Sequence, residues 1–451
     1  MEEKKLGVRN VVSVSVGLVI ATSCLVSLGQ GAGNIGVVFI IACMLNMISI
    51  ASMSELNALM PNTTGGLAQY TLTSLGPVPT MVSMVGGYIL CNVLSAGVEA
   101  SIFSYAMGEI LHLPISNFWY TFLITVILLI ANLKGVDMFA KIQDLVAYLL
   151  LGSMLFMGLI GAFGMGTGVK VDQPYYMTTN PADIIPMIAV AFWLFIGAEY
   201  AIPISKDVKN AKRNVPLGMF IGLAIMCAVQ SVMIFGFHNY TPWKELTESP
   251  APHLLYGMNL LGTPGKLWMT LVAALAVVST QNSSVQGLAN ICQGMAKMNM
   301  MPQFFAKTNK NNVPYIGVWF VSLLILFFGY ISNDSSKLIS FLILVGSVFW
   351  MVSYIFAHID VLVLRHRLPK APRTFKVPFG PVLPLIGIAG TIYMIVNIST
   401  DPTERLMIWL VTGITFLVLF IYSVIWIKFK MKIPVFKSVP LEKVMAMENE
   451  M

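Results

Sequence analysis

The chain has 451 residues, of which 57% are hydrophobic and only 10% are charged. Soluble proteins carry about 25% charged residues, so this composition excludes a soluble globular protein. The 27 Lys and Arg residues outnumber the 20 Asp and Glu residues and give a net charge of +7, whose meaning depends on where the charges lie.

Twelve apolar segments, each long enough to cross a bilayer as a helix, follow one another along the chain. They cover residues 10–30, 35–56, 80–107, 117–133, 144–164, 184–205, 215–237, 267–294, 314–331, 338–361, 381–398 and 406–427. The loops between them are too short to hold a soluble domain. The sequence therefore predicts an all-α integral membrane protein with 12 transmembrane helices, forming a single polytopic membrane domain over residues 1–451.

The basic residues predict the orientation of these helices, because Lys and Arg concentrate in cytoplasmic loops. With the N-terminus inside, 22 of the 27 basic residues lie on the cytoplasmic side and 5 lie outside. We therefore expect a multi-pass protein of the cell membrane with cytoplasmic N- and C-termini and a cytoplasmic tail at 429–451. Because the positive charge is spread over six loops without a binding motif, nucleic acid is not an expected partner.

Two acidic residues lie deep inside apolar segments, Glu99 in the third and Glu199 in the sixth, and no Lys or Arg lies at comparable depth. Ionisable groups within a membrane are energetically costly and mark functional sites. Such carboxylates must be protonated, bonded to polar neighbours or neutralised by a bound cation. The last option predicts a positively charged substrate, and the alternative is a neutral carboxylic acid that bonds between helices.

Small and polar residues interrupt two of the segments. The first segment contains Ala21-Thr22-Ser23-Cys24, and the sixth contains Gly197-Ala198-Glu199. Transporter sites lie where paired helices unwind and expose backbone groups. The first and sixth segments hold matching positions in two five-helix repeats, at about 10–165 and 183–361. Helix packing through small residues is the alternative for the first stretch.

Several stretches resemble one transporter family. The sixth segment, Trp193 to Glu199, and the following loop, Val208 to Pro216, resemble those of the amino acid-polyamine-organocation (APC) permeases, especially their basic amino acid and polyamine exchangers. Ser54 to Pro61, Gly294 to Phe305 and Leu364 to Pro378 agree with the same family. The chain is identified as a member of the APC superfamily.

The resemblance implies a LeuT-type fold, a 5+5 inverted repeat with two extra C-terminal helices at about 380–428, and a substrate bound at the broken first and sixth helices. By position, Trp193 is similar to the aromatic gate that closes over the substrate, Phe195 to its pocket neighbour, and Glu199 to the acid of proton coupling. An indole face over a desolvated cation contributes about 1 to 2 kcal/mol, which agrees with the role implied for Trp193.

The chain also departs from the family. Most members have a Gly-Ser-Gly or Gly-Ala-Gly stretch at the first break, whose amides receive the substrate carboxylate, whereas this chain has Ala21-Thr22-Ser23-Cys24. A substrate without a carboxylate is thereby favoured. The eighth segment is unusually polar at 279–284, so this stretch is expected either to line the pocket, with Asn282 as the named candidate, or to supply oxygens to a Na⁺ site, for which Ser283 and Ser284 are weak candidates. Interhelical hydrogen bonding is the alternative for this stretch.

The substrate site predicted from these arguments draws on four segments. Its residues are Ala21, Thr22, Ser23, Cys24, Glu99, Phe103, Trp193, Phe195, Gly197, Ala198, Glu199 and Asn282.

The functional hypothesis is a secondary active transporter for cationic amines, polyamines or basic amino acids, working by alternating access as an exchanger or a proton-linked carrier. The alternatives are a neutral amino acid permease with protonated glutamates and a non-transporting substrate sensor. An enzyme is not expected, because the deep segments offer no Ser-His or paired-Asp arrangement. The expected partners are an amine or amino acid substrate and the lipid bilayer, a homodimer is compatible with the sequence, and no cofactor is expected.

Overall fold

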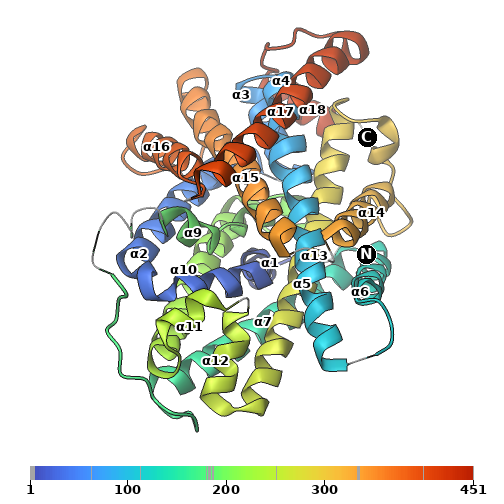
Figure 1. Ribbon diagram of the computed structural model, residues 1–451. Coiled ribbons are helices and arrows are strands. Elements are labelled where there is room, and N and C mark those ends of the chain that lie inside the picture. The colour runs from blue at the N-terminus through green and yellow to red at the C-terminus, as the bar shows by residue number, and fades with distance from the viewer. Residues whose placement is uncertain are drawn as a thin grey trace.

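The computed structural model describes residues 6–61, 63–111, 113–178, 180, 184, 187–249, 251–332, 336–399 and 401–449. Within these residues the chain forms a helical bundle (Figure 1), and extended pairing is limited to one bridge between Leu6 and Val208. The fold class predicted from the composition is therefore confirmed as all-helical.

The helices are named in chain order. Those of the first third are α1 (Val8–Val19), α2 (Thr22–Leu59), α3 (Leu67–Ser74), α4 (Pro77–Met84), the π-helical η1 (Val85–Leu90), α5 (Cys91–Leu111), α6 (Phe118–Leu133) and α7 (Val136–Ala162). Those of the middle are α9 (Met187–Trp193), η2 (Ala198–Ala201), η3 (Ser205–Asp207), α10 (Ala211–Tyr240), α11 (Trp243–Glu248), α12 (Pro252–Leu261) and α13 (Thr263–Lys297). The last are η4 (Gln303–Ala306), α14 (Tyr315–Ser332), α15 (Ser336–Arg367), α16 (Val382–Val396), α17 (Pro402–Trp426), η5 (Ile427–Met431) and α18 (Leu441–Asn449).

Eight helical stretches of the described residues are long and apolar enough to cross a membrane. A ninth span results if α1 and the start of α2, which meet at an angle of 62°, are counted as one broken helix. The shorter apolar helices Phe118–Leu133, Ala191–Ala201 and Val382–Val396 fall in the remaining predicted segments. All twelve apolar segments thus contain helix, and the protein is a multi-pass membrane protein.

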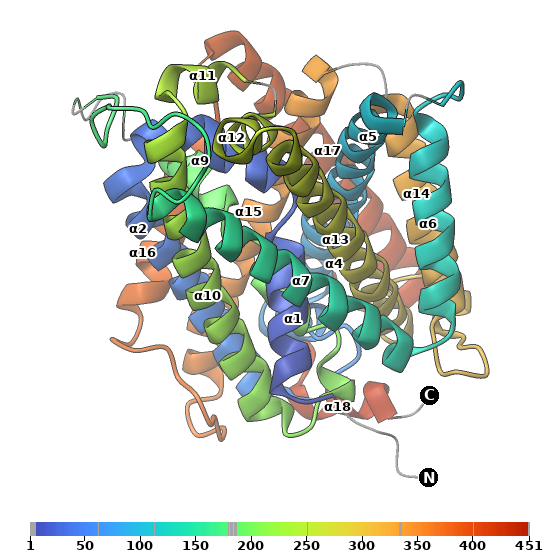
Figure 2. The ribbon, with the colours of Figure 1, turned by 90° about the horizontal axis from the view of Figure 1, so that it is seen from below.

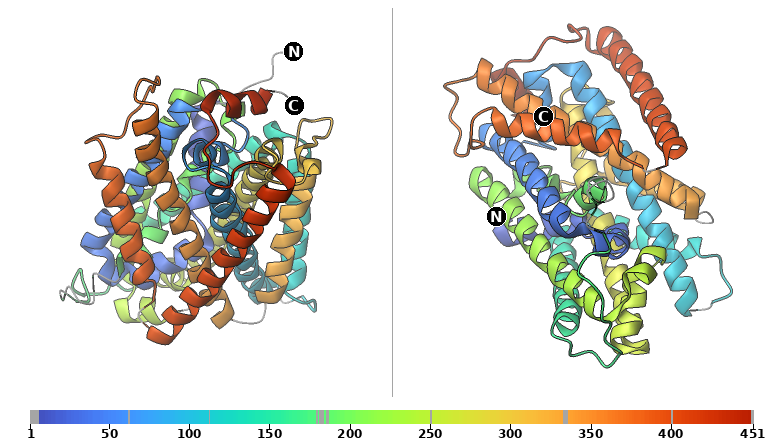
Figure 3. Two further views of the ribbon diagram at one scale, coloured as in Figure 1. Left: turned by 90° about the horizontal axis from the view of Figure 1, so that it is seen from above. Right: turned by 60° about the vertical axis from the view of Figure 1, so that its left-hand side comes forward.

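The short helix α1 lies in the middle of the bundle, next to α7, α10 and α13 (Figure 2). The C-terminal α17 lies at the periphery (Figure 3). In their most apolar stretches, 89% of the Pro77–Ser104 span is buried but only 17% of the Pro402–Met431 span. The core that positions α1 is therefore built by the earlier spans, and α17 turns most of its apolar surface outward.

The start of α1 and the short α18 lie at the same end of the molecule (Figure 2). Leu6 is held there by two backbone hydrogen bonds, because its N–H donates to Asp207 (2.7 Å) and its carbonyl accepts from Lys209 (2.8 Å). The described part of the chain therefore begins and ends on one side, in keeping with the predicted topology. The assignment of that side to the cytoplasm remains a prediction from the basic loops.

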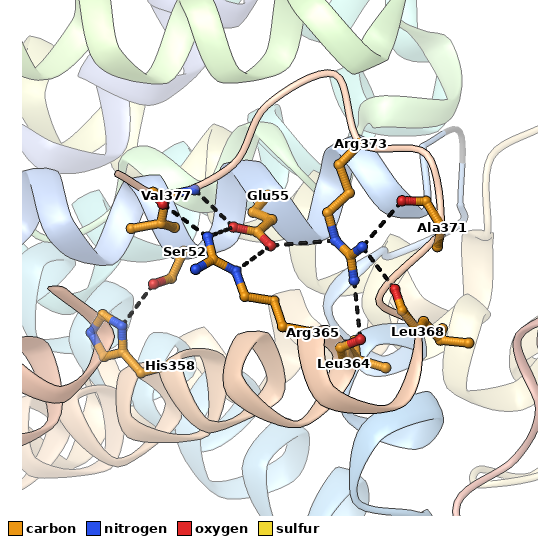
Figure 4. A network of polar contacts seen from close by, with 9 residues as sticks. All are labelled: Ser52, Glu55, His358, Leu364, Arg365, Leu368, Ala371, Arg373 and Val377. Carbon is orange, nitrogen blue, oxygen red and sulfur yellow. Dashed lines mark hydrogen bonds and ion pairs between the residues drawn. The ribbon is translucent and has the colours of Figure 1, made fainter. Parts of the chain in front are cut away.

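A buried cluster of charges lies where α2 ends (Figure 4). Glu55 is 2% exposed and accepts hydrogen bonds from Arg365 Nε (2.8 Å) and Nη2 (2.5 Å) and from the backbone N–H of Val377 (2.8 Å). Arg373, in the loop before α16, pairs with the same carboxylate at 3.3 Å. One carboxylate therefore joins the end of α2 to α15 and to the loop that follows it.

The sequence predicted only two buried acidic residues, Glu99 and Glu199, and this prediction was incomplete. The structure also buries Glu55 and Asp360, which is 1% exposed. Asp360 accepts hydrogen bonds from the hydroxyls of Thr71 (2.7 Å) and Ser74. Asp360 lies within α15, which continues to Arg367, and its side chain is turned toward α3.

Replacing Glu55 with Gln should strongly destabilise the protein. The substitution removes the carboxylate from two arginines that it neutralises, and breaking a buried ion pair in this way costs about 3 to 5 kcal/mol. We expect a large fall in the thermal unfolding temperature of the purified protein. This temperature is measured by size-exclusion chromatography of samples heated to increasing temperatures. Glu442→Gln, the same change on the exposed surface of α18, is the control, and equal unfolding temperatures for the two variants would contradict the role given to Glu55.

Candidate substrate site

The first span is broken between α1 and α2. Helix α1 ends at Val19, Ala21 is extended, with φ −88° and ψ 162°, and α2 begins at Thr22. The Thr22 hydroxyl donates to the carbonyl of Ala273 on α13 (3.2 Å). The small polar side chains of this stretch thus bond to neighbouring helices where the backbone leaves the helix.

Glu99 caps the start of α2. Its carboxylate, carried by α5, accepts hydrogen bonds from the backbone N–H of Ser23 at 3.0 Å to one oxygen and 3.1 Å to the other. The first N–H groups of a helix have no partner within the helix, and the helix dipole favours negative charge there. Glu99 is 1% exposed, so this helix start supplies the buried carboxyl group with hydrogen-bond donors inside the protein.

The sixth span is broken between α9 and η2. Gly197 has φ +118°, a conformation that side chains disfavour, and a Cβ at this position would lie 3.1 Å from the Leu18 side chain. The Gln230 side chain donates to the freed carbonyl of Leu194 (2.9 Å). The break therefore depends on a glycine and on a polar partner from α10.

The two breaks face each other. The indole N–H of Trp193 donates to the Ser23 hydroxyl (3.2 Å), the Cys24 thiol donates to the Trp193 carbonyl (3.7 Å), and the Ser15 hydroxyl donates to the Ala198 carbonyl (3.1 Å). Polar contacts thus join α1 and α2 to both sides of the second break.

Glu199 is completely buried and is bonded to α15. Its carboxylate accepts hydrogen bonds from the Tyr354 hydroxyl (2.7 Å), the Trp350 indole N–H and the Gly197 N–H (3.2 Å). Three donors satisfy most of the acceptor capacity of a carboxylate. Glu199 therefore fixes η2 to α15 without needing a cation from outside the protein.

A cavity of about 20 Å³ lies between the breaks. Its polar lining consists of Asn92, Ser95, Glu99, Thr280, Ser284 and the indoles of Trp193 and Trp350. Its apolar lining consists of Leu18, Val19, Ala21, Cys24 and Ile196. This volume suffices for about one water molecule, so the cavity has no room for a larger solute in this conformation.

The predicted site residues divide into two groups. Ala21, Cys24, Glu99 and Trp193 line the cavity. The other predicted residues that belong to the two breaks do not contact the cavity. They are Thr22, Ser23, Phe195, Gly197, Ala198 and Glu199. Phe195 packs instead against Phe39 of α2, with ring centroids 4.9 Å apart.

The structure places Phe103 and Asn282 away from this cavity. Phe103 lies one helical turn beyond Glu99, where α5 meets α6, and lines an apolar groove with residues such as Trp119. The Asn282 side chain donates to Gln143 (3.0 Å) and accepts from Asn132 (2.9 Å). A helix turns about 100° per residue, so the cavity-facing Thr280 and Ser284 share a face that Asn282 does not.

Eight residues that line the cavity were not among those predicted for the substrate site. Three are the apolar Leu18, Val19 and Ile196, and the other five are Asn92, Ser95, Thr280, Ser284 and Trp350. Ser95 lies four residues before Glu99, and Thr280 lies four before Ser284, so helical spacing was a usable signal for these residues. The polar stretch 279–284 was expected to line the pocket or to supply Na⁺ ligands, and of its two Na⁺ candidates Ser284 lines the cavity whereas Ser283 does not. Trp350 lies in an apolar stretch that gave no signal.

Comparison with known proteins places this site in a family context. A family model described as amino acid permease matches residues 6–431. The chain is 22% identical to the branched-chain amino acid permease BcaP of Bacillus subtilis, with 93% of each chain covered. It is 23% identical to the gamma-aminobutyric acid permease of the same organism, with 91% of this chain and 92% of that protein covered.

Two further similarities bear on the fold and on the relatives. A methylthioribose transporter of Bacillus subtilis is 20% identical, with 91% of this chain and 90% of that protein covered. A crystal structure of the Eremococcus coleocola manganese transporter is 13% identical, covers 94% of both chains and superimposes with a TM-score of 0.59. The LeuT-type fold expected from the sequence is confirmed. The expected similarity to basic amino acid and polyamine exchangers is not supported, because these relatives are named for other substrates.

Replacing Gly197 with Ala should impair the protein, because the new Cβ meets Leu18 and the backbone conformation disfavours any side chain. Backbone strain of this kind costs about 1 to 3 kcal/mol. We expect a lower unfolding temperature together with weaker solute binding. Gly152→Ala, in the α7 helix with no atom within 4 Å of the added Cβ, is the matched control and should unfold at the same or a higher temperature. Equal behaviour of the two variants would show that the break does not require a glycine.

Proposed function

Because this chain belongs to the amino acid permease family, we propose that it moves a small amine-bearing solute across the cell membrane by alternating access, with both termini in the cytoplasm. The protein is a transporter and not an enzyme. The observation that carries the proposal is the meeting of two broken spans around a closed polar cavity.

The closed cavity suggests how access alternates. The hydrogen bond from Trp193 to Ser23 joins the two breaks across the cavity, and the Trp193 and Trp350 rings meet edge to face with centroids 6.2 Å apart. Because the cavity is too small for an amino acid, opening toward either side must separate contacts such as the Trp193–Ser23 hydrogen bond and the Trp193–Trp350 ring contact. We infer that Trp193 acts as a gate and that the two breaks act as the hinges.

Two candidate substrate classes follow from the charges. The names of the branched-chain amino acid and gamma-aminobutyric acid permeases support a neutral amino acid, and the three donors that bond Glu199 within the protein weaken the argument for a cation. The second candidate is a cationic amine. It is favoured by Glu99, because no Lys or Arg is found among the described residues that line the cavity.

Uptake by proteoliposomes that contain only the purified protein tests the permease function. We expect saturable uptake of at least one labelled compound from a panel of leucine, gamma-aminobutyric acid, lysine and the matching amines, and no uptake by protein-free liposomes. Uptake without any partner protein would also decide against a substrate sensor. Specific binding without flux would contradict the transporter proposal.

Glu199→Gln separates proton coupling from a purely structural role. If Glu199 carries the coupled proton, the variant should lose uptake driven by a pH gradient but keep exchange of labelled for unlabelled substrate, because exchange needs no net proton movement. Tyr354→Phe removes one donor to the same carboxylate without removing the titratable group, and it serves as the comparison. Equal loss of driven uptake and exchange in Glu199→Gln would show that the residue acts through structure alone.

A further inference from the structure

We propose that Glu99 takes the place of a substrate carboxylate at the start of α2, so that the permease selects amines whose amine-bearing carbon carries no carboxylate. The proposal rests on the permease function above and names the substrate class of the same site. It is carried by the hydrogen bonds of Glu99 and by three hydroxyl groups that share its cavity.

The start of α2 is where a substrate carboxylate would be expected to bind. Helix α2 begins at Thr22, immediately after the break and beside the cavity. Free N–H groups and the dipole at such a helix start attract anions, and broken helices of transporters use them to hold substrate carboxylates. In this chain the N–H of Ser23 already donates to both oxygens of Glu99, at 3.0 and 3.1 Å.

Glu99 competes with any substrate carboxylate for the N–H group at the start of α2. It is fixed to α5 and 1% exposed, so its carboxylate is present beside α2 at a high effective concentration. A second carboxylate at the same helix start would lie against a like charge. No Lys or Arg among the described residues that line the cavity could neutralise the pair.

Three hydroxyl groups in the cavity lack hydrogen-bond partners within the part of the chain that the structure describes. They belong to Ser95, Thr280 and Ser284, which are 8%, 4% and 1% exposed and line the cavity together with Glu99. Buried polar groups in proteins are normally hydrogen-bonded, so these hydroxyls are available to bond a polar group that enters the cavity.

An ammonium group fits this set of partners. It has three donors and no acceptor, hydroxyl oxygens accept hydrogen bonds, and Glu99 supplies the opposite charge. Hydroxyl groups could also donate to an anion, so the sign of the preferred ligand is decided by Glu99. The apolar side chains of Leu18, Val19 and Ile196 complete the lining and suit a hydrocarbon body.

Matched pairs of compounds that differ only in the α-carboxylate test the proposal. The pairs are leucine with isopentylamine, glutamate with gamma-aminobutyric acid, and lysine with cadaverine. Binding is measured on the full-length protein in nanodiscs and uptake in proteoliposomes. Because like charges brought together cost several kcal/mol, we expect the compound without the α-carboxylate to bind at least about 100-fold tighter in at least one pair.

Two substitutions at Glu99 define the cause of this selectivity. Glu99→Ala leaves the Ser23 N–H free, so the preference should reverse toward the α-amino acid of the pair. Glu99→Gln keeps the side-chain size without the charge and should remove most of the preference for the amine. Glu442→Gln, the same change on the exposed surface of α18, should bind both compounds as the unaltered protein does.

The outcomes separate this proposal from the function on which it rests. If the unaltered protein binds and transports leucine as well as or better than isopentylamine, and shows the same preference in the other pairs, the proposal for Glu99 is wrong and the permease function stands. If no compound of any pair binds or is taken up, both fail. The comparison within each pair uses the unaltered protein and is decisive even if the Glu99→Ala variant does not fold.

Discussion

Interrupting a helix inside hydrocarbon is the constraint on which the rest of the site depends. Lipid offers no hydrogen bonds, so the N–H and C=O groups freed at a break must find partners within the protein. Glu99 accepts from the N–H of Ser23, and Gln230 donates to the carbonyl of Leu194. The polar cavity lies where these partners gather, because the same side chains that satisfy the breaks also surround the space between them.

The two deep carboxylates illustrate how surroundings assign different roles to the same chemical group. Glu199 is bonded by Trp350 and Tyr354 and by its own turn, so it fixes the second break. Glu99 accepts from the N–H of Ser23 at the start of α2 and faces a cavity with unpartnered hydroxyls. Of the two, Glu99 is therefore the carboxylate that an entering solute would meet.

Helix α15 connects this site to the end of the bundle. Its Trp350 and Tyr354 bond to Glu199 at the second break, and its Arg365 pairs with Glu55 where α2 ends. The chain therefore uses buried polar contacts both near the cavity and at the end of α2. Movement at the second break must act against α15, which gives this helix a central place in the proposed alternating access.

The sequence by itself determined the membrane setting, the apolar segments and the two breaks, because hydropathy and interrupting small residues are local properties. It also identified Glu99 and Trp193 at the cavity. Only the tertiary structure decided the partners, since Glu99 and Ser23 are 76 residues apart and Glu55 and Arg365 are 310 residues apart. Such contacts depend on how helices pack and rotate, which also directs Ser284 into the cavity and Asn282 away from it.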